Sequence, residues 1–392
     1  MFEPHVGADN ERQAAPRFVM ITFDNVSKRY ADGTVAVDEL NLECATGEVT
    51  VLVGTSGSGK TTSMRMINRM IDPTSGRILL DGHDVAGQDP VRLRRGMGYV
   101  IQQAGLFPHR TIVDNIATIP ILLGRRRREA RLEALALMDR VGLDQRMAKR
   151  YPYQLSGGQQ QRVGVARALA SDPPILLMDE PFSAVDPVVR GELQNELLRL
   201  QADLAKTIVF VTHDIDEAIR VGDKVAVFRT GGQLVQVATP ERLLAAPADD
   251  FVTGFLGVDR GIRRLSFSKT TNLDLRQLPT AVVGSPAADV VTAARAAGLG
   301  WVIAVDGDGR PVGWIPTDRL ARETVVEKDL IEPLGHPFTV GVDSLRAALD
   351  ASVLSPSGSA VAIDTDGRLL GVASGSEIAL AIAADLAARK EG

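Results

Sequence analysis

A glycine-rich segment with a single lysine follows directly after an apolar run. Val49–Val53 leads into Gly54-Thr55-Ser56-Gly57-Ser58-Gly59-Lys60-Thr61-Thr62. This fits the pattern Gly-x-x-x-x-Gly-Lys-Ser/Thr, in which backbone N–H groups surround a phosphate and the next helix points its positive end at it. We expect Lys60 to reach the β- and γ-phosphates of a nucleotide and the Thr61 hydroxyl to ligate Mg²⁺. The apolar strand before the loop and the expected helix Ser63–Met70 after it favour this interpretation over an unrelated glycine-rich turn.

Two carboxylates and a histidine follow other short apolar runs. Ile175–Met178 is followed at once by Asp179 and Glu180, and Ile208–Thr212 is followed by His213. Taken alone, the acid pair would suit a solvated strand end, and the histidine would suit a structural role. The segments that follow, Pro-Phe-Ser-Ala-Val-Asp after the acids and Asp-Ile-Asp-Glu-Ala after the histidine, instead favour a functional role for all three residues.

A second anion cradle is expected at the start of another helix. Leu155-Ser156-Gly157-Gly158-Gln159 stands just before an expected helix that runs through Ala170. A serine hydroxyl and glycine N–H groups at a helix N-terminus suit an anion. Here the chain resembles the ABC ATPase family, whose signature is Leu-Ser-Gly-Gly-Gln. In that family the signature closes over ATP bound to the partner subunit, so the resemblance implies a head-to-tail homodimer.

The resemblance also assigns roles to the acids and the histidine. It implies that Asp179 holds Mg²⁺, directly or through water, and that Glu180 is the general base that polarises the attacking water. A general base is worth about 10²–10⁴-fold in rate. His213 is expected to contact the γ-phosphate. The loop from Ser183 to Asp186 is expected to touch the opposite subunit and help orient the base, and Asp186 is counted with the nucleotide site.

Two further residues are assigned by resemblance. Tyr30 matches the aromatic residue that stacks on adenine, although it could instead lie at the rim. Gln102 matches the glutamine that senses Mg²⁺ and the γ-phosphate, because of its distance from the segment Leu106–His109. Gln103 is the adjacent alternative, which the spacing disfavours. In the family this segment receives a helix from the membrane subunit.

Composition limits the remaining classes. The chain has 392 residues, 45% of them apolar, which is enough for two or three domains with real cores. A net charge of −5 argues against nucleic acid as the main partner. The single cysteine, Cys44, excludes an internal disulfide framework and fits a reducing compartment. No run approaches the roughly 18 consecutive apolar residues of a membrane span, so any membrane role is expected to come through a partner.

Alternating apolar runs and helical stretches predict an α/β fold for the first two thirds of the chain. Such alternation implies a largely parallel sheet covered on both faces. We expect a flexible tail at residues 1–19 and, at residues 20–258, a phosphate-loop ABC ATPase domain with the helical subdomain that the family carries. Within it, the run Arg125–Arg128 begins an amphipathic helix that is expected to place Leu132, Leu135, Ala136 and Met138 on one face. The arginines are expected to form a solvated face, although such runs also touch lipid headgroups.

An internal repeat marks the rest of the chain. Asp306–Gly313 matches Asp364–Gly371 at a constant offset of 58 residues, with an apolar run before each copy and a helical stretch after it. Such an offset predicts two copies of one strand–helix module. The repeat resembles paired CBS modules, so we expect a smaller α/β tandem CBS domain at residues 259–392, with copies at about 262–327 and 328–385.

CBS pairs often bind adenine nucleotides, and the family's sugar-binding pattern can be compared with the residues of each copy. In the second copy Ser374 and Glu377 fit the family's sugar-binding pattern. In the first copy Pro316 and Arg319 occupy those places and do not fit, so we expect one competent ligand site at most. The alternative is a purely structural or dimerising tail.

An importer ATPase followed by paired CBS modules resembles the energising subunit of quaternary-amine uptake systems. The resemblance implies ATP hydrolysis that drives import of glycine betaine, carnitine, choline or proline betaine, with ATP and Mg²⁺ as cofactors and no nucleic acid. It implies a second copy of the chain, integral membrane permease subunits and, indirectly, an extracytoplasmic substrate-binding protein as partners. The chain would then lie on the cytoplasmic face of the cell membrane. An importer of another small solute, or a soluble ABC ATPase regulator not coupled to transport, are the alternatives.

Overall fold

The computed structural model describes residues 20–102, 104–183 and 185–388. Contacts within the chain divide it into two compact units, one that ends at Leu256 and one that begins at Gly257. The sequence placed this division between residues 258 and 259. The predicted tail at residues 1–19, the alternative glutamine Gln103, and Ala184 of the predicted partner-facing loop lie outside the described residues.

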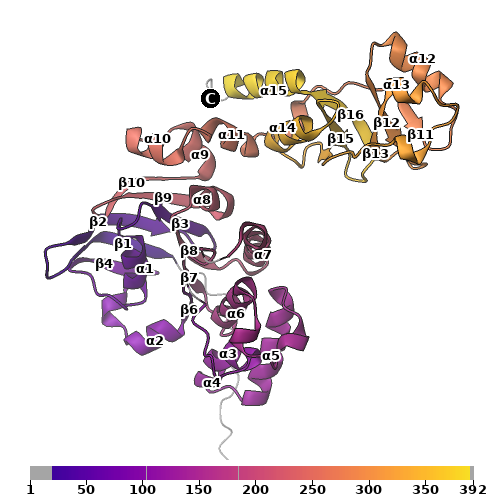
Figure 1. Ribbon diagram of the computed structural model, residues 1–392. Helices are drawn as coiled ribbons and strands as arrows, with labels where there is room; N and C mark the ends of the chain where they lie inside the picture. Colours follow the sequence, from indigo (N-terminus) through magenta and orange to yellow (C-terminus); the bar gives the residue numbers. More distant parts are fainter. Residues whose placement is uncertain (1–19, 103, 184, 389–392) are drawn as a thin grey trace, which may run out of the picture. The chain divides into compact units, whose positions relative to one another are not determined.

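A six-stranded sheet forms the centre of the first unit (Figure 1). Its order is β10-β9-β3-β8-β7-β6, and all neighbouring strands are parallel except β10, which is antiparallel to β9. Strands β3, β7, β8 and β9 are nearly continuous buried apolar runs rich in Val, Ile and Leu, as expected where both faces of a sheet are covered. The predicted α/β fold is therefore confirmed. The strands are β3 (Val49–Gly54), β6 (Met97–Val100), β7 (Ile175–Asp179), β8 (Thr207–Thr212), β9 (Lys224–Arg229) and β10 (Gln233–Ala238).

A second, antiparallel sheet was not predicted from the sequence. Its order is β2-β1-β4-β5, and β1 pairs with both β2 and β4 through registers interrupted by bulges. Phe23, Leu40 and Ile78 of this sheet share a buried core with Met64 and Ile67 of helix α1. The strands are β1 (Ile21–Arg29), β2 (Val35–Cys44), β4 (Ser75–Leu80) and β5 (His83–Asp84), and α1 spans Lys60–Ile67.

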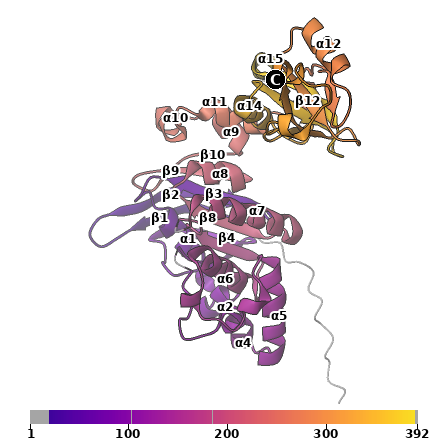
Figure 2. The same ribbon diagram turned by 45° about the vertical axis from the view of Figure 1, so that its right-hand side comes forward.

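Helices complete the first unit, and those between β6 and β7 pack against one another as a group, with α6 against β6 (Figure 1). Figure 2 shows the same group from another side, with α4, α5 and α6 labelled. They are α3 (Ile112–Ile116), α4 (Thr118–Leu122), α5 (Arg127–Arg140) and α6 (Gly157–Leu169). The other helices are α2 (Pro90–Arg95), α7 (Pro187–Leu204), α8 (Ile215–Val221), α9 (Pro240–Ala245) and α10 (Asp250–Leu256). None of the helices in the described ranges combines the length and apolar character that a membrane crossing requires.

The predicted apolar face of α5 is wrong for Leu132 and Ala136, which are exposed, and right for Met138, which is buried. Its buried residues are Ala130, Ala134 and Met138, whereas Leu132 is 60% exposed. Alanines four residues apart form a narrow stripe that lets α5 pack closely on α3 and α6. The arginines Arg125–Arg128 are all exposed, as predicted. Arg125 is also bonded to Glu133, and Arg127 lies 3.4 Å from Asp114.

The second unit contains two small sheets with the same topology. In each, a parallel pair is followed by an antiparallel hairpin, in the orders β11-β12-β13 and β14-β15-β16. The hairpin strands of the two copies keep the 58-residue offset of the sequence repeat. The elements are α11 (Arg260–Arg264), β11 (Thr280–Val282), α12 (Ala288–Ala296), β12 (Trp301–Val305), β13 (Pro311–Pro316), α13 (Thr317–Leu320), β14 (Phe338–Thr339), α14 (Leu345–Leu354), β15 (Ser359–Ile363), β16 (Leu369–Ser374) and α15 (Gly375–Ala388).

Each module of the second unit has its own small core, and a third cluster joins them. Ile303 and Trp314 of the first module pack against Val361 and Val372 of the second. The two Asp-Gly-Arg turns also lie side by side, because the Leu369 N–H donates to the carbonyl of Gly309 at 3.1 Å. The two copies therefore form one compact body.

Asp114 ties α3 to α5, and we expect this tie to stabilise the first unit. Its carboxylate accepts from Arg131 Nε at 2.8 Å and Nη2 at 2.7 Å, and from the Thr111 hydroxyl at 2.8 Å. The hydrogen bonds from Arg131, more than the opposing effect of burial, lower the pKa of Asp114 from 3.8 to about 2. An Asp114→Asn variant should lose about 1–2 kcal/mol of unfolding free energy at neutral pH.

The pH dependence separates this effect from simple loss of packing. A carboxyl whose folded pKa is depressed contributes stability above its unfolded pKa and loses it as pH falls through the folded value. The gap between the wild-type chain and Asp114→Asn should therefore close from about pH 4 toward pH 2. Denaturant titrations across that range measure it, with Glu133→Gln as the matched control at a more exposed ion pair. A gap at neutral pH no larger than that of the control would show that the tie contributes nothing.

Candidate nucleotide site

The phosphate loop connects the carboxyl end of β3 to the amino end of α1. Gly59, at the N-cap of α1, has a left-handed φ of 86°, and a Cβ atom there would lie 2.0 Å from the Ala36 carbonyl oxygen. Gly57 is also left-handed, at φ 78°, but faces open space. Only glycine satisfies the first position, because both the backbone conformation and the close approach exclude a side chain. The conformation of the loop therefore depends on glycine at this position and on the close approach of strand β2.

Lys60 is held inside this loop. Its Nζ donates to the carbonyl oxygens of Gly54 at 2.9 Å and Thr55 at 2.8 Å, and to the Ser58 hydroxyl at 3.3 Å. Burial lowers the pKa of Lys60, and the negative charges of Glu180 and Asp179 oppose that shift. The loop therefore holds a cation where a phosphate group is expected. Of the other predicted loop residues, Thr55 and Ser56 are exposed, and Thr62 is half-buried on α1.

Thr61 and Asp179 meet across the loop. The Thr61 hydroxyl donates to Asp179 Oδ1 at 2.8 Å, and Arg65 Nη2 lies 3.6 Å from Oδ2 of the same carboxylate. A hydroxyl and a carboxylate oxygen are hard donors of the kind that Mg²⁺ prefers when phosphates and water supply the rest of its shell. No cluster of three or more His, Cys, Asp or Glu residues with metal-binding geometry occurs in the described ranges.

Glu180 lies between Gln102 and His213. Gln102 Nε2 donates to Glu180 Oε2 at 3.1 Å, and His213 Nδ1 lies 3.2 Å from Oε1. Glu180 has a positive φ of 45°, rare for a residue with a side chain, and its N–H donates to the Val211 carbonyl at 2.9 Å. Strained backbone of this kind gathers at functional sites. The structure thus brings together three residues that the sequence predicted separately.

The signature residues lie elsewhere in the same unit. Ser156 caps α6 by accepting from the Gln159 N–H at 3.3 Å, and the Gln159 side chain accepts from the Ser156 N–H at 3.0 Å. Gly157 and Gly158 form the first turn of that helix. Across the described ranges, no hydrogen bond or ion pair links these four residues to the phosphate loop of their own chain.

The two remaining predicted site residues are Asp186 and Tyr30. Asp186 caps α7, where its side chain accepts from the Val189 N–H at 3.1 Å. Tyr30 follows the end of β1 and is 42% exposed, with Lys28 Nζ 5.4 Å from the centre of its ring. An exposed ring at this place is available to stack on a planar ligand.

Arg65 was missed from the sequence. It lies on α1 four residues after Thr61, so the two side chains share one face of the helix and both reach Asp179. The four-residue spacing from Thr61 was the signal that could have found it, but only on a helix that begins at Lys60, whereas the helix expected from the sequence began at Ser63. Arg65 adds a positive charge beside the predicted metal ligand.

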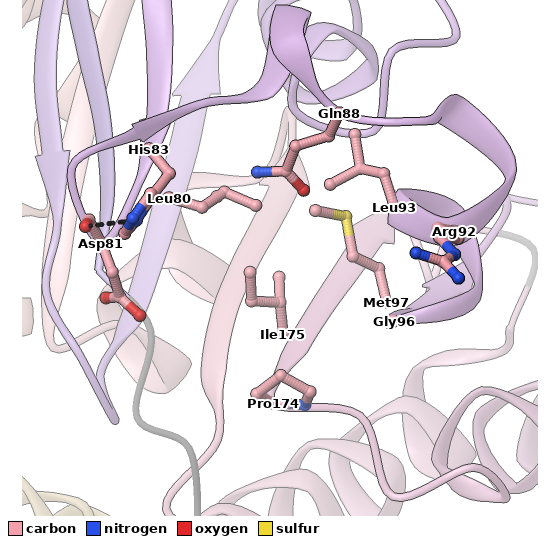
Figure 3. A pocket seen from close by; sticks show the side chains of 10 residues that line it. All are labelled: Leu80, Asp81, His83, Gln88, Arg92, Leu93, Gly96, Met97, Pro174 and Ile175. Atoms are coloured by element: carbon pink, nitrogen blue, oxygen red, sulfur yellow. Dashed lines mark hydrogen bonds between the residues drawn. The ribbon is translucent and has the colours of Figure 1, made fainter.

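A separate pocket of about 440 Å³ does not coincide with any predicted site residue (Figure 3). Met97 and Ile175, which begin β6 and β7, form part of its floor, and His83 is hydrogen-bonded to the Asp81 carbonyl on one side. It therefore lies at the amino ends of these strands, whereas the acids and the phosphate loop lie at carboxyl ends. Its lining residues are Leu80, Asp81, His83, Gln88, Arg92, Leu93, Gly96, Met97, Pro174 and Ile175.

The signature helix separates this protein from other phosphate-loop nucleotide-binding proteins, and fold and site together define an ABC-type ATPase. The ABC transporter family profile matches residues 37–183. A dimeric bacterial ABC transporter cassette matches with a TM-score of 0.52 and 35% identity, over 56% of this chain and 98% of that one.

Comparison with curated relatives shows which kinds of ABC transporter protein this chain resembles. An osmoprotectant import ATP-binding protein of Salmonella typhimurium is 42% identical over 92% of this chain and 95% of its own length. A choline transport ATP-binding protein of Bacillus subtilis is 51% identical over 63% of this chain and 65% of its own. The chain therefore belongs to the family of ABC transporter ATP-binding proteins that contains these relatives. It binds ATP and hydrolyses it as an ABC transporter subunit.

Replacing Glu180 with Gln should separate ATP binding from hydrolysis. The amide keeps the size of the side chain but cannot accept a proton, while the phosphate loop is unchanged. Phosphate release should fall by at least about 10²-fold, whereas ATP binding persists and ATP-dependent dimers accumulate. Both are measured on one sample.

Glu192→Gln provides the control, because Glu192 carries the same substitution on an exposed ion pair with Arg162. It should turn over at the wild-type rate. Near-normal hydrolysis by the Glu180→Gln protein would sink the assignment of Glu180 as the base.

Proposed function

We propose that this chain energises import of quaternary-amine osmoprotectants such as glycine betaine, carnitine, choline or proline betaine. The observation that carries the proposal is the 42% identity to an osmoprotectant import ATP-binding protein across nearly the whole of both chains. Relatives named for choline, for glycine betaine/carnitine/choline and for glycine betaine/proline betaine transport support it at 47–51% identity over 58–63% of this chain. Other subunits would recognise the solute.

The site geometry supports specific roles in hydrolysis. Thr61 and Asp179 would hold Mg²⁺, which supplies charge neutralisation at the phosphates when bound. Lys60 and the loop N–H groups bind and orient the β- and γ-phosphates, and Tyr30 stacks on adenine. Glu180 accepts the proton of the attacking water, while Gln102 and His213 hold its carboxylate in place and sense the γ-phosphate.

A head-to-tail homodimer is the assembly that suits the signature residues. Ser156–Gln159 make no bond to their own phosphate loop in the described part of the chain, so a second copy would bring them to the nucleotide, together with the loop from Ser183 to Asp186. Dimeric ABC cassettes among the solved structures support this arrangement. We further propose integral membrane permease subunits as partners, an extracytoplasmic binding protein as the source of solute, and a peripheral location on the cytoplasmic face of the membrane.

The second unit is proposed to be a regulatory pair of CBS modules. Glu377, which the resemblance placed at a ribose, accepts from the Ser374 N–H at 2.6 Å and hydroxyl at 2.9 Å, and it pairs with Arg276 at 2.7 Å. An adenine nucleotide would have to replace some of these contacts. We therefore propose a ligand site at Ser374 and Glu377. The alternative is that the second unit has a purely structural role.

Mixed subunits test the shared site. A Lys60→Ala subunit paired with a Ser156→Arg subunit should leave one of the two composite sites intact and the other doubly damaged. In tethered heterodimers we expect about half of the wild-type ATP sites by equilibrium binding, since each site takes its loop from one copy and its signature from the other. Heterodimers that hold no ATP between subunits would count against the head-to-tail arrangement.

Uptake in liposomes tests the transport proposal and the role of the second unit together. The chain is purified with the permease that binds it, and ATP-driven uptake of glycine betaine, carnitine and choline is compared with that of the Glu180→Gln complex. A chain truncated after Val258 keeps every residue assigned to hydrolysis, so it should still drive uptake but respond differently to internal salt and to adenine nucleotides.

The outcomes separate the alternatives. Uptake of none of these amines would redirect the proposal to another solute, and failure to co-purify with any integral membrane protein would favour a regulator not coupled to transport. A salt response that fades at high ionic strength indicates exposed charge contacts, which weaken as the Debye length shrinks from about 10 Å at 0.1 M to about 3 Å at 1 M. If full-length and truncated complexes respond identically, the tail is structural.

A further inference from the structure

Arg190, on the first turns of α7, contacts two segments that the proposed mechanism uses. Its Nη2 donates to the Val185 carbonyl at 3.3 Å, in the loop that follows Glu180. Its Nη1 lies 3.4 Å from Asp214 Oδ2, and its Nε lies 3.8 Å from Glu217 Oε1. Asp214 follows His213 directly and caps α8, so one guanidinium spans the loop and the histidine segment.

Glu217 anchors the strand end that carries His213. Its side chain is only 4% exposed, and Oε2 accepts from the Thr212 hydroxyl at 2.7 Å. The same hydroxyl accepts from the Asp214 N–H at 3.0 Å. The residues on both sides of His213 are therefore tied to one buried carboxylate. A buried carboxylate is costly unless a cation and hydrogen bonds compensate it.

Arg190 is the cation available for that compensation. Burial is the main cause that raises the pKa of the Glu217 carboxyl, and the nearby Arg190 guanidinium opposes that shift. Arg220, on the same helix as Glu217, donates instead to Asn195 at 2.8 Å. Arg190 Nε is buried and has no hydrogen-bond partner in the described ranges, so a shift of under about 1 Å toward Glu217 would complete a charge-assisted bond.

We propose that Arg190 is a positioning residue that fixes the strand end carrying His213 to the loop that follows Glu180. The proposal rests on the proposed role of His213 at the γ-phosphate. Arginine suits the task, because its planar guanidinium presents several donors in fixed directions to a carbonyl and two carboxylates at once. Since the loop from Ser183 to Asp186 is the one proposed to touch the partner subunit, Arg190 would pass a shift of that loop on to His213.

Replacing Arg190 with Gln should lower the turnover number more than the affinity for ATP. Tyr30, Lys60 and Thr61 are untouched, so KM should change by less than about twofold, while misplacement of His213 should lower kcat by about tenfold or more. The kcat of Arg190→Lys should lie between those of the wild-type protein and Arg190→Gln, because a single ammonium reaches only some of the three acceptors. Arg199→Gln on the same helix is the control, since Arg199 is exposed and pairs with Glu196, one turn away.

A double variant distinguishes positioning from plain stabilisation. Arg190→Gln alone leaves a buried carboxylate without its cation, so its melting temperature should fall. In Arg190→Gln/Glu217→Gln that charge is gone and the melting temperature should largely return. The contacts to Val185 and Asp214 are still missing, so kcat should stay low. Recovery of kcat together with melting temperature, or wild-type kcat in Arg190→Gln, would overturn the proposal.

His213→Ala in the same assay separates this inference from the function on which it rests. If His213→Ala and Arg190→Gln both lose turnover, the proposed role of His213 and the positioning role of Arg190 are both supported. If His213→Ala loses turnover while Arg190→Gln does not, only the positioning role fails. If His213→Ala turns over normally, the proposed role of His213 fails and the positioning role fails with it.

Discussion

The parallel register of β3, β8, β7 and β6 is the constraint on which the site depends. Val53 lies opposite Thr212, and Asp179 lies opposite Val211, so three strands end within a residue or two of one another. Because parallel strands present their carboxyl ends at one edge, the phosphate loop after β3, the acids after β7 and the histidine after β8 must meet there. The bond between Gln102, after β6, and Glu180 extends the same edge. A slip of one residue in any pair would turn the terminal side chains to the wrong face.

The sequence was sufficient to predict which residues lie at this edge of the sheet, because the patterns that mark them are local. Each catalytic candidate follows a short apolar run, and the glycine-rich pattern by itself marks the phosphate loop, although the atom that excludes a side chain at Gly59 is the Ala36 carbonyl oxygen on strand β2. What local patterns could not supply is pairing across the chain. The antiparallel sheet joins β1 to β4, which lie on opposite sides of β3 and α1 in the sequence, and its bulged registers blur the alternation that would reveal it. The contact between Arg190 and Glu217 was hidden for the same reason.

The wrong face of α5 has a different cause. The prediction placed Leu132, Leu135, Ala136 and Met138 on one face, yet the helix buries Ala130 and Ala134 with Met138 and leaves Leu132 exposed. Apolar surface area favours burying leucine, but close approach between helices favours the smaller side chain, and here the second effect decides. In the second unit the turn chemistry was visible from the repeat, whereas the pairing of Glu377 with Arg276 was not, because Arg276 lies far upstream of the second copy. Resemblance to a ribose-binding pattern therefore located the acid but not its partner.

The starts of three helices show how the chain divides work between its own side chains and a ligand. Asp186 caps α7, and Ser156 with Gln159 caps α6 reciprocally, so both helices begin with their orphan N–H groups partly satisfied by the chain. The N-cap of α1 is Gly59, which has no side chain to offer, and the first helical residue is a buried lysine. A helix start that carries positive charge and lacks a side-chain cap is stabilised by an anion from outside. The phosphate of a nucleotide can thus act as the cap of α1.

The serine of α6 already serves its own helix and can meet a second phosphate only through its hydroxyl and the glycine N–H groups beside it. The two cradles are therefore unequal: one needs its ligand to complete a helix, and the other closes over a ligand already bound.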